Sequence, residues 1–224
     1  MAVFLNEQQF GYATDHIGFP NLLLCMGVVC MANNTLYGVH LDSPNNTAVV
    51  IAGFSGWLTT AGVQANQICA LYGSANWNER YPGTGNKKSA WKAEMRQIAQ
   101  AIGYADVARG FDTSILVSDT TNGNANSTRY ARPKNKGAYI EYQPDFGKSK
   151  CKIFYKKSWK MDYTDTTAVG NARADFTEYS SRNNDFRAQN TFFKTTSAAS
   201  LSANSSASDL HELNYFLRQI SFNV

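Results

Sequence analysis

An uninterrupted apolar run at residues 22–32 constrains the fold of this chain more than any other feature of its sequence. Such a run, closed by turn residues, is typical of a strand that is buried on both faces of a sheet. Asn33 and Asn34 follow, and because asparagine tolerates a positive φ, the pair predicts a two-residue hairpin turn. Residues 35–41 then return as the second strand. The sequence therefore predicts a hairpin at residues 22–41 whose first strand lies inside a sheet.

The other segments indicate an α+β fold with mixed or antiparallel sheets and flanking helices. In the clearest helix, Trp91, Met95, Ile98 and Ile102 recur at the spacing of an amphipathic helix. Helices are predicted at residues 57–72, 89–104 and 208–222. Further strands are predicted at residues 47–54, 107–117, 138–142 and 151–159, with a strand or mixed segment at 3–13. Loops are predicted at residues 15–20, 76–88 and 119–136.

The length of 224 residues fits one domain, residues 1–224, in which 161–207 form a loop-rich appended region. Charged residues make up only 17% of the chain, below the roughly 25% of an average domain, and the net charge is +4. Lysines gather between residues 148 and 160, interleaved with aromatic residues. We interpret this cluster as the solvated face of a strand, and we expect no nucleic-acid partner because no nucleic-acid-binding motif accompanies it.

The four cysteines are expected to be free thiols, since the N-terminus does not resemble a secretory signal. They form no CxxC pair and no cluster with metal-ligand spacing, so we predict neither a metal nor another cofactor. No apolar run reaches the ~20 residues that a bilayer requires, and no membrane partner is expected. The oligomeric state stays open.

Catalytic candidates come from the register that a tight turn imposes on the hairpin. If Asn33 and Asn34 form the turn, Gly27 lies opposite His40, and Cys25 becomes a diagonal neighbour of His40 on the same face. Such neighbours have Cβ atoms ~7–8 Å apart, within reach of a sulfur–imidazole contact. Gly27 would leave room for the imidazole ring, whereas Cys30 lies on the other face. The register therefore selects Cys25 as nucleophile and His40 as base.

A thiol beside an imidazole suits hydrolysis of a carboxamide. The imidazole takes the thiol proton, the thiolate attacks the carbonyl carbon, and the imidazolium protonates the leaving nitrogen. The alternative is that Cys25 and His40 are structural residues, because cysteine is often buried and a histidine on a strand is often structural.

The two strands of the hairpin resemble a known family. The sequence LCMGVV at residues 24–29, followed by YGVHL at residues 37–41, is similar to the nucleophile hairpin of the chemoreceptor glutamine deamidases and the cytotoxic necrotizing factor-type toxins. The resemblance covers about 20 residues. It implies a sheet packed on a sheet with helices outside, and deamidation or transglutamination of glutamine in a partner protein. It implies Cys25 and His40 as the catalytic pair. It also implies a bacterial toxin or effector, which would lie in the bacterial cytoplasm or be exported into a target cell by a dedicated secretion system.

The resemblance leaves the group that orients His40 unassigned. Some family members carry a threonine six residues before the cysteine, but Phe19 occupies that position here, and Leu23 and Leu24 replace the usual small polar residues before the cysteine. Asn21, Ser55 and Asp15 are candidates for the orienting group.

The remaining histidines and cysteines are expected to be structural. We place His16 on a surface loop, His211 near the start of the last helix, Cys69 on the apolar stripe of a helix, and Cys151 at the start of a strand. The leading hypothesis is a protein glutamine deamidase. A papain-like cysteine amidase or peptidase and a non-enzymatic binding module or inactive relative are the alternatives.

Overall fold

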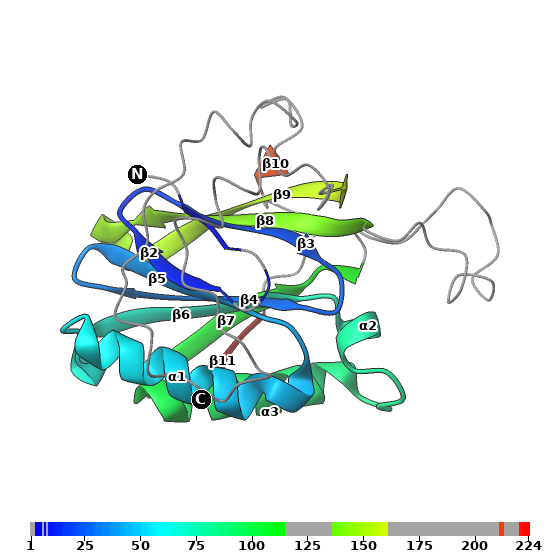
Figure 1. The fold of residues 1–224 in the computed structure, drawn as a ribbon, viewed down its shortest axis with the longest axis horizontal. Coiled ribbons are helices and arrows are strands. Elements are labelled where there is room, and N and C mark those ends of the chain that lie inside the picture. The colour runs from blue at the N-terminus through cyan, green and yellow to red at the C-terminus, as the bar shows by residue number, and fades with distance from the viewer. Residues whose placement is uncertain (1–2, 6, 8, 115–135, 161–210, 213–219) are drawn as a thin grey trace.

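Two β-sheets pack face to face, and helices cover the outer face of one of them (Figure 1). The computed structural model describes residues 3–5, 7, 9–114, 136–160, 211–212 and 220–224. Among these, one sheet has the order β1-β3-β8-β9-β10 and the other the order β11-β7-β6-β4-β5-β2. Most neighbouring strands are antiparallel, while β1 with β3 and β6 with β7 are parallel. The predicted α+β class with mixed and antiparallel sheets and flanking helices is confirmed.

The elements have the following bounds. The strands are β1 Val3–Phe4, β2 Phe10–Ala13, β3 Ile17–Leu22, β4 Met26–Ala32, β5 Thr35–Leu41, β6 Ile68–Ala75, β7 Val107–Asp112, β8 Lys136–Asp145, β9 Lys150–Lys160, β10 His211–Glu212 and β11 Ile220–Asn223. The helices are α1 Thr47–Thr60, α2 Trp77–Arg80 and α3 Lys87–Ile102, with single 3₁₀ turns at Pro44–Asn46, Ala65–Gln67 and Phe146–Lys148.

The hairpin of β4 and β5 forms in the predicted register. Asn33 and Asn34 adopt φ values of 51° and 56°, the left-handed conformation that a type I′ turn requires. Gly27 consequently lies opposite His40. Strand β4 hydrogen-bonds to β5 on one side and to β6 on the other, and all of its residues are buried. The predicted two-sided burial is confirmed.

The apolar run at 22–32 is not one strand, however. Leu22 ends β3, residues 23–25 form a bend, and β4 begins only at Met26. The predicted loop at 15–20 is correspondingly wrong from residue 17 onward, because β3 pairs with both β1 and β8. Its pairing with β8 shifts between Phe19 and Leu22, around Pro20, whose ring nitrogen has no hydrogen to donate.

Two predictions of secondary structure are wrong in the segment from residue 47 to residue 75: a predicted strand is helical, and most of a predicted helix is not. Residues 47–54, predicted as a strand, begin α1, which buries Val50, Phe54 and Trp57 at helical spacing. The helix predicted at 57–72 ends at Thr60, and residues 68–75 form β6, which pairs with both β4 and β7. Tertiary pairing outweighs local helix preference there.

The strands predicted at 107–117, 138–142 and 151–159 correspond to β7, β8 and β9, and the helix predicted at 89–104 is α3. The helix predicted at 208–222 is wrong where the chain is described, since β10 pairs with β9 and β11 pairs with β7. The appended region at 161–207 lies outside the described residues.

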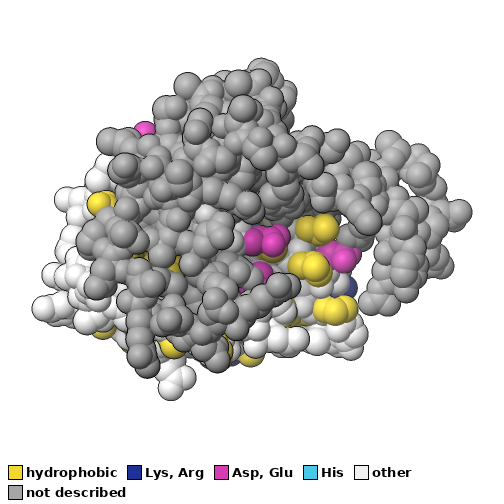
Figure 2. Space-filling model, viewed as in Figure 1, with side chains coloured by type: hydrophobic (Ala, Val, Ile, Leu, Met, Phe, Trp, Pro, Cys, Tyr) yellow, Lys and Arg dark blue, Asp and Glu magenta, His cyan; other side chains and the backbone are white. Residues whose placement is uncertain are grey.

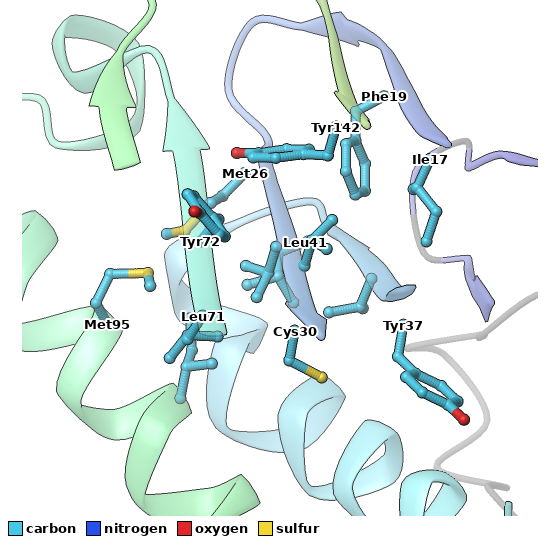
Figure 3. Close-up of a cluster of buried hydrophobic side chains, with 14 of the residues drawn as sticks. Ile17, Phe19, Met26, Cys30, Tyr37, Leu41, Leu71, Tyr72, Met95 and Tyr142 are labelled. Carbon is cyan, nitrogen blue, oxygen red and sulfur yellow. The ribbon is translucent and has the colours of Figure 1, made fainter. Parts of the chain in front are cut away.

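The side chains of β4 alternate between two environments. Met26, Val28 and Cys30 face the layer of α1 and α3, whereas Gly27 and Val29 face the five-stranded sheet. Figure 3 shows Cys30 and Leu71 directed toward the helices and Phe19 on the opposite side. Any site built from Cys25 and His40 therefore lies at the sheet–sheet interface.

Candidate functional site

Cys25 and His40 lie at the open end of the hairpin. His40 belongs to one of its last paired positions, and Cys25 lies just beyond them. Cys25 stands in the bend just before β4, and His40 is the penultimate residue of β5. The ladder between the two strands ends with the pair of Met26 and Leu41. The position of Cys25 is thus set by the bend and its contacts rather than by strand pairing.

A backbone carbonyl fixes the tautomer of His40. The imidazole is fully buried, and its Nδ1 lies 2.7 Å from the carbonyl oxygen of Leu5. Because a carbonyl only accepts, Nδ1 carries the proton and Nε2 keeps its lone pair. Among the described residues Nε2 has no hydrogen-bond partner. Burial lowers the pKa of His40 and so favours the neutral ring, while the hydrogen bond to Leu5 acts in the opposite direction.

The thiol of Cys25 donates to a carboxylate. Its Sγ lies 3.0 Å from Oε1 of Glu7, and the side chain is 3% exposed. Burial raises the pKa of Cys25, the charge and hydrogen bond of Glu7 raise it further, and the charge of Arg80 lowers it. The group is therefore a thiol in this arrangement, with its proton directed at Glu7. The expected hydrogen bond to the imidazole is not formed.

The two candidates nevertheless reach the same short segment. His40 bonds to Leu5 and Cys25 to Glu7, two positions apart between β1 and β2. This segment is held on both sides, because the amide of Leu5 donates to Gly18 and the carbonyl of Gln9 accepts from the amide of His40. Cys25 and His40 thus contact one short segment, but Cys25 lies outside the paired strands, so the register alone does not place it.

The ring of Phe19 occupies the space next to Gly27 on the side of the five-stranded sheet. A Cβ on Gly27 would lie 2.6 Å from Cγ of Phe19, so the ring lies directly on the glycine. The same ring stands edge-on to the imidazole of His40, with centroids 5.7 Å apart and planes at 87°. The expectation that Gly27 leaves room for the histidine is therefore wrong. The glycine instead allows Phe19 to wall the imidazole on its other side.

A buried ion pair, which sequence reasoning missed, lies behind the bend. Arg80 uses all five of its N–H groups: Nε and Nη2 donate to the two oxygens of Glu94, at 2.9 and 2.5 Å, and Nη2 also donates to the hydroxyl of Thr47. Its Nη1 donates to the carbonyl oxygens of Leu24, at 2.9 Å, and Asp42, at 3.2 Å. The guanidinium therefore touches the residue before Cys25 and the second residue after His40.

Glu94 completes this cluster. Its carboxylate also accepts from the hydroxyls of Thr47 and Tyr81. Burial alone would raise the pKa of Glu94, but the hydrogen bonds and charge of Arg80 outweigh it and lower the pKa. Arg80 was overlooked because residues 76–88 were predicted to be a loop, whereas Trp77–Arg80 form α2.

Two of the three proposed orienting residues are seen in other contacts. The Ser55 hydroxyl donates to the carbonyl of Ala101, between α1 and α3, and Asp15 lies 3.4 Å from His16. The side chain of Asn21 lies outside the described residues. The orienting group is the carbonyl of Leu5, and a backbone atom leaves no signal in a sequence.

The other cysteines and histidines have these positions. Cys30 is fully buried on the helix side of β4. Cys69 was predicted to lie in the core of a helix but is exposed on β6, where its thiol donates to the carbonyl of Met31. Cys151 lies near the start of β9, as predicted, and His16 lies in the loop between β2 and β3. His211 lies in β10 rather than at a helix start.

Two predicted absences concern metals and membranes. Within the described ranges, no three His, Cys, Asp or Glu side chains gather so as to hold a metal ion. In the same part of the chain, none of the helices has the length and apolar character needed to span a bilayer.

On β9, Ile153 and Tyr155 are buried while Lys152 is exposed, the alternation expected of a solvated strand face. This agrees with the interpretation of the lysine cluster.

No protein-family model matches this sequence, and no curated protein matches it significantly.

Proposed function

We propose that this protein is a cysteine-dependent hydrolase of carboxamides, with Cys25 as nucleophile and His40 as general base and acid, and that it deamidates glutamine in a partner protein. One observation carries the proposal. The carbonyl of Leu5 holds the proton of His40 on Nδ1, so that Nε2 keeps its lone pair, and Cys25 contacts the same segment through Glu7. A base that is oriented by a third group is the arrangement on which thiol activation depends.

The reaction balances with these groups alone. Nε2 of His40 takes the Cys25 proton, and the thiolate attacks the side-chain carbonyl carbon of glutamine. The imidazolium then protonates the departing nitrogen, and ammonia leaves. Water, deprotonated by Nε2, cleaves the thioester, releasing glutamate and restoring the thiol.

The contact between Cys25 and Glu7 describes the state without substrate. Glu7 is exposed, so its side chain can leave the thiol without disturbing the core. Leu24, next to Cys25, is 52% exposed, which supports the approach of a protein substrate to this bend. Figure 2 shows acidic and apolar side chains next to one another on the described part of the face in view.

The alternatives differ in what they require. A papain-like arrangement needs its cysteine at the start of a helix, whereas Cys25 precedes strand β4. A binding module without activity is favoured by the raised pKa of the buried Cys25 thiol. Thiol reactivity separates this second candidate from the enzyme.

The test measures ammonia release from an N-acetylated glutaminyl-glycine dipeptide and from casein, with the wild type, Cys25→Ser, His40→Gln and the control Cys69→Ser. We expect release by the wild type and the control only. In parallel, iodoacetamide labelling at neutral pH with peptide mapping should show selective labelling of Cys25. Release that persists in Cys25→Ser contradicts the proposal, and absence of release together with unselective labelling supports the binding module.

A further inference from the structure

The strand pairing of the hairpin stops just short of Cys25, the candidate nucleophile. The last paired residues are Met26 and Leu41, so the next positions outward, Cys25 and Asp42, are beyond the ladder. A two-stranded end without hydrogen bonds frays, and a nucleophile placed there needs another restraint.

Arg80 supplies a bond to each side of this unpaired end. A single nitrogen, Nη1, donates to the carbonyl of Leu24 at 2.9 Å and to the carbonyl of Asp42 at 3.2 Å. These carbonyls belong to the bend that holds Cys25 and to the chain that leaves β5 after His40. The guanidinium therefore bridges the two strands where backbone pairing has ended.

The bridge is rigid because the rest of the guanidinium is also held. Arg80 is 2% exposed, and Nε and Nη2 make a two-pronged contact with Glu94 of α3. Tyr81 and Thr47 hydrogen-bond to the same carboxylate. A buried ion pair is often no more stabilising than an apolar cluster of the same volume, so stability alone does not account for this one.

We propose that Arg80 is a positioning residue for the candidate site, fixing the bend of Cys25 against the end of the strand that carries His40. The inference rests on the proposed function. The two bonds from Nη1 set where the sulfur stands, and the positive charge favours the thiolate, in line with the lowering effect of Arg80 on the pKa of Cys25. An arginine is needed for this because a lysine ammonium cannot reproduce the planar fork.

The experiment separates position from charge with Arg80→Lys and Arg80→Met, using Arg109→Met as control. Arg109 lies on β7, away from the cluster, where it bonds to the carbonyl of Val107. Two quantities are measured on folded protein: ammonia release, and the pH dependence of Cys25 alkylation by iodoacetamide. We expect Arg80→Lys to lower kcat by about 10- to 100-fold, since a displacement of about 1 Å has an effect of that size. Its alkylation profile should stay close to that of the wild type.

Arg80→Met should lower kcat at least as far and also move the alkylation profile to higher pH. Arg80→Lys retains the positive charge that balances Glu94, so this variant is expected to fold. A kcat within twofold of the wild type in Arg80→Lys would overturn the positioning role. An unchanged alkylation profile in Arg80→Met would overturn the electrostatic part. Failure of the proposed function is recognised separately, as ammonia release that does not depend on Cys25 or as no release from the wild type, whereas the alkylation profile needs no activity.

Discussion

Cys25 and Cys30 provide an internal comparison, since both are buried thiols, Cys25 just before β4 and Cys30 within it. Burial raises the pKa of each. Around Cys30, after burial and its own backbone hydrogen bond, the groups that affect the pKa are other thiols, those of Cys69 and Cys151. Around Cys25 they are Glu7, Arg80 and Asp42. The comparison teaches that surroundings, and not the thiol or its burial, distinguish a candidate nucleophile from a core residue.

The largest effect is expected from exchanging each thiol for a hydroxyl. Cys25→Ser should reduce ammonia release on the order of 10³-fold or more, because serine is a far weaker nucleophile at this site. Cys30→Ser should leave kcat within a few-fold and lower only the free energy of unfolding, since it places a hydroxyl in an apolar layer. Parallel kinetics and urea unfolding of both variants measure this. Equal losses of activity would break the comparison.

The next effect concerns the charged cluster of Arg80 and Glu94, which contacts the residue before Cys25. Glu94→Gln leaves Arg80 buried without its counter-charge, which should lower the free energy of unfolding by about 3–5 kcal/mol. Because the pKa of Glu94 is lowered in the folded state, the stability it contributes is present above the ordinary glutamate pKa of ~4.3 and is lost as the pH falls toward the folded value. Urea unfolding between pH 7 and pH 3 should therefore show a smaller acid-dependent loss in Glu94→Gln than in the wild type. An equal loss would place the acid-sensitive group elsewhere.

A third effect compares how tightly the two faces are packed. Gly27→Ala would press against the root of the Phe19 ring, which cannot swing away, and should cost about 1–3 kcal/mol. Gly73→Ala, on the helix side, meets the flexible side chain of Met95 and should cost less. Thermal or urea unfolding of the two variants provides the measurement. The opposite order would show that the helix side is the more rigid.

The smallest effect is expected at Glu7. Removing its charge in Glu7→Gln should lower the pKa of Cys25 and increase the rate of iodoacetamide labelling at pH 7 a few-fold. Labelling of Cys30, on the other face, should not change. A slower reaction of Cys25 would show that Glu7 assists the loss of the thiol proton rather than retaining it.

Local sequence signals predicted the parts of this molecule whose structure is locally determined. Asn33 and Asn34 specify their own turn, and α3 follows from the spacing of its apolar residues. The helix ends at Ile102, before Gly103 with its φ of 71°, and not at residue 104 as predicted. In contrast, the apolar residues at 47–54 are compatible with either a strand or a buried helix, and periodicity alone does not separate the two. Their packing against other elements makes them helical.

The residues of the candidate site also fall into two groups, those that local sequence could predict and those that only the fold brings together. The position of His40 opposite Gly27 follows from the turn and could be predicted, whereas Cys25 lies outside the paired strands. The carbonyl of Leu5, the carboxylate of Glu7 and the guanidinium of Arg80 arrive from distant positions, and only the completed fold places them beside the hairpin. Their identification therefore required coordinates.

The turn of Asn33 and Asn34 has a consequence for how this protein tolerates insertions and deletions. It stands seven residues from His40, about 23 Å along an extended strand, far from any reacting atom. Because side chains alternate, loss of one residue from the turn that shifts the pairing by one would send the imidazole into the helix layer and bring Leu41 to its place. Such a deletion would abolish the proposed activity, although it is far from the candidate site and every residue named in that site would be unchanged.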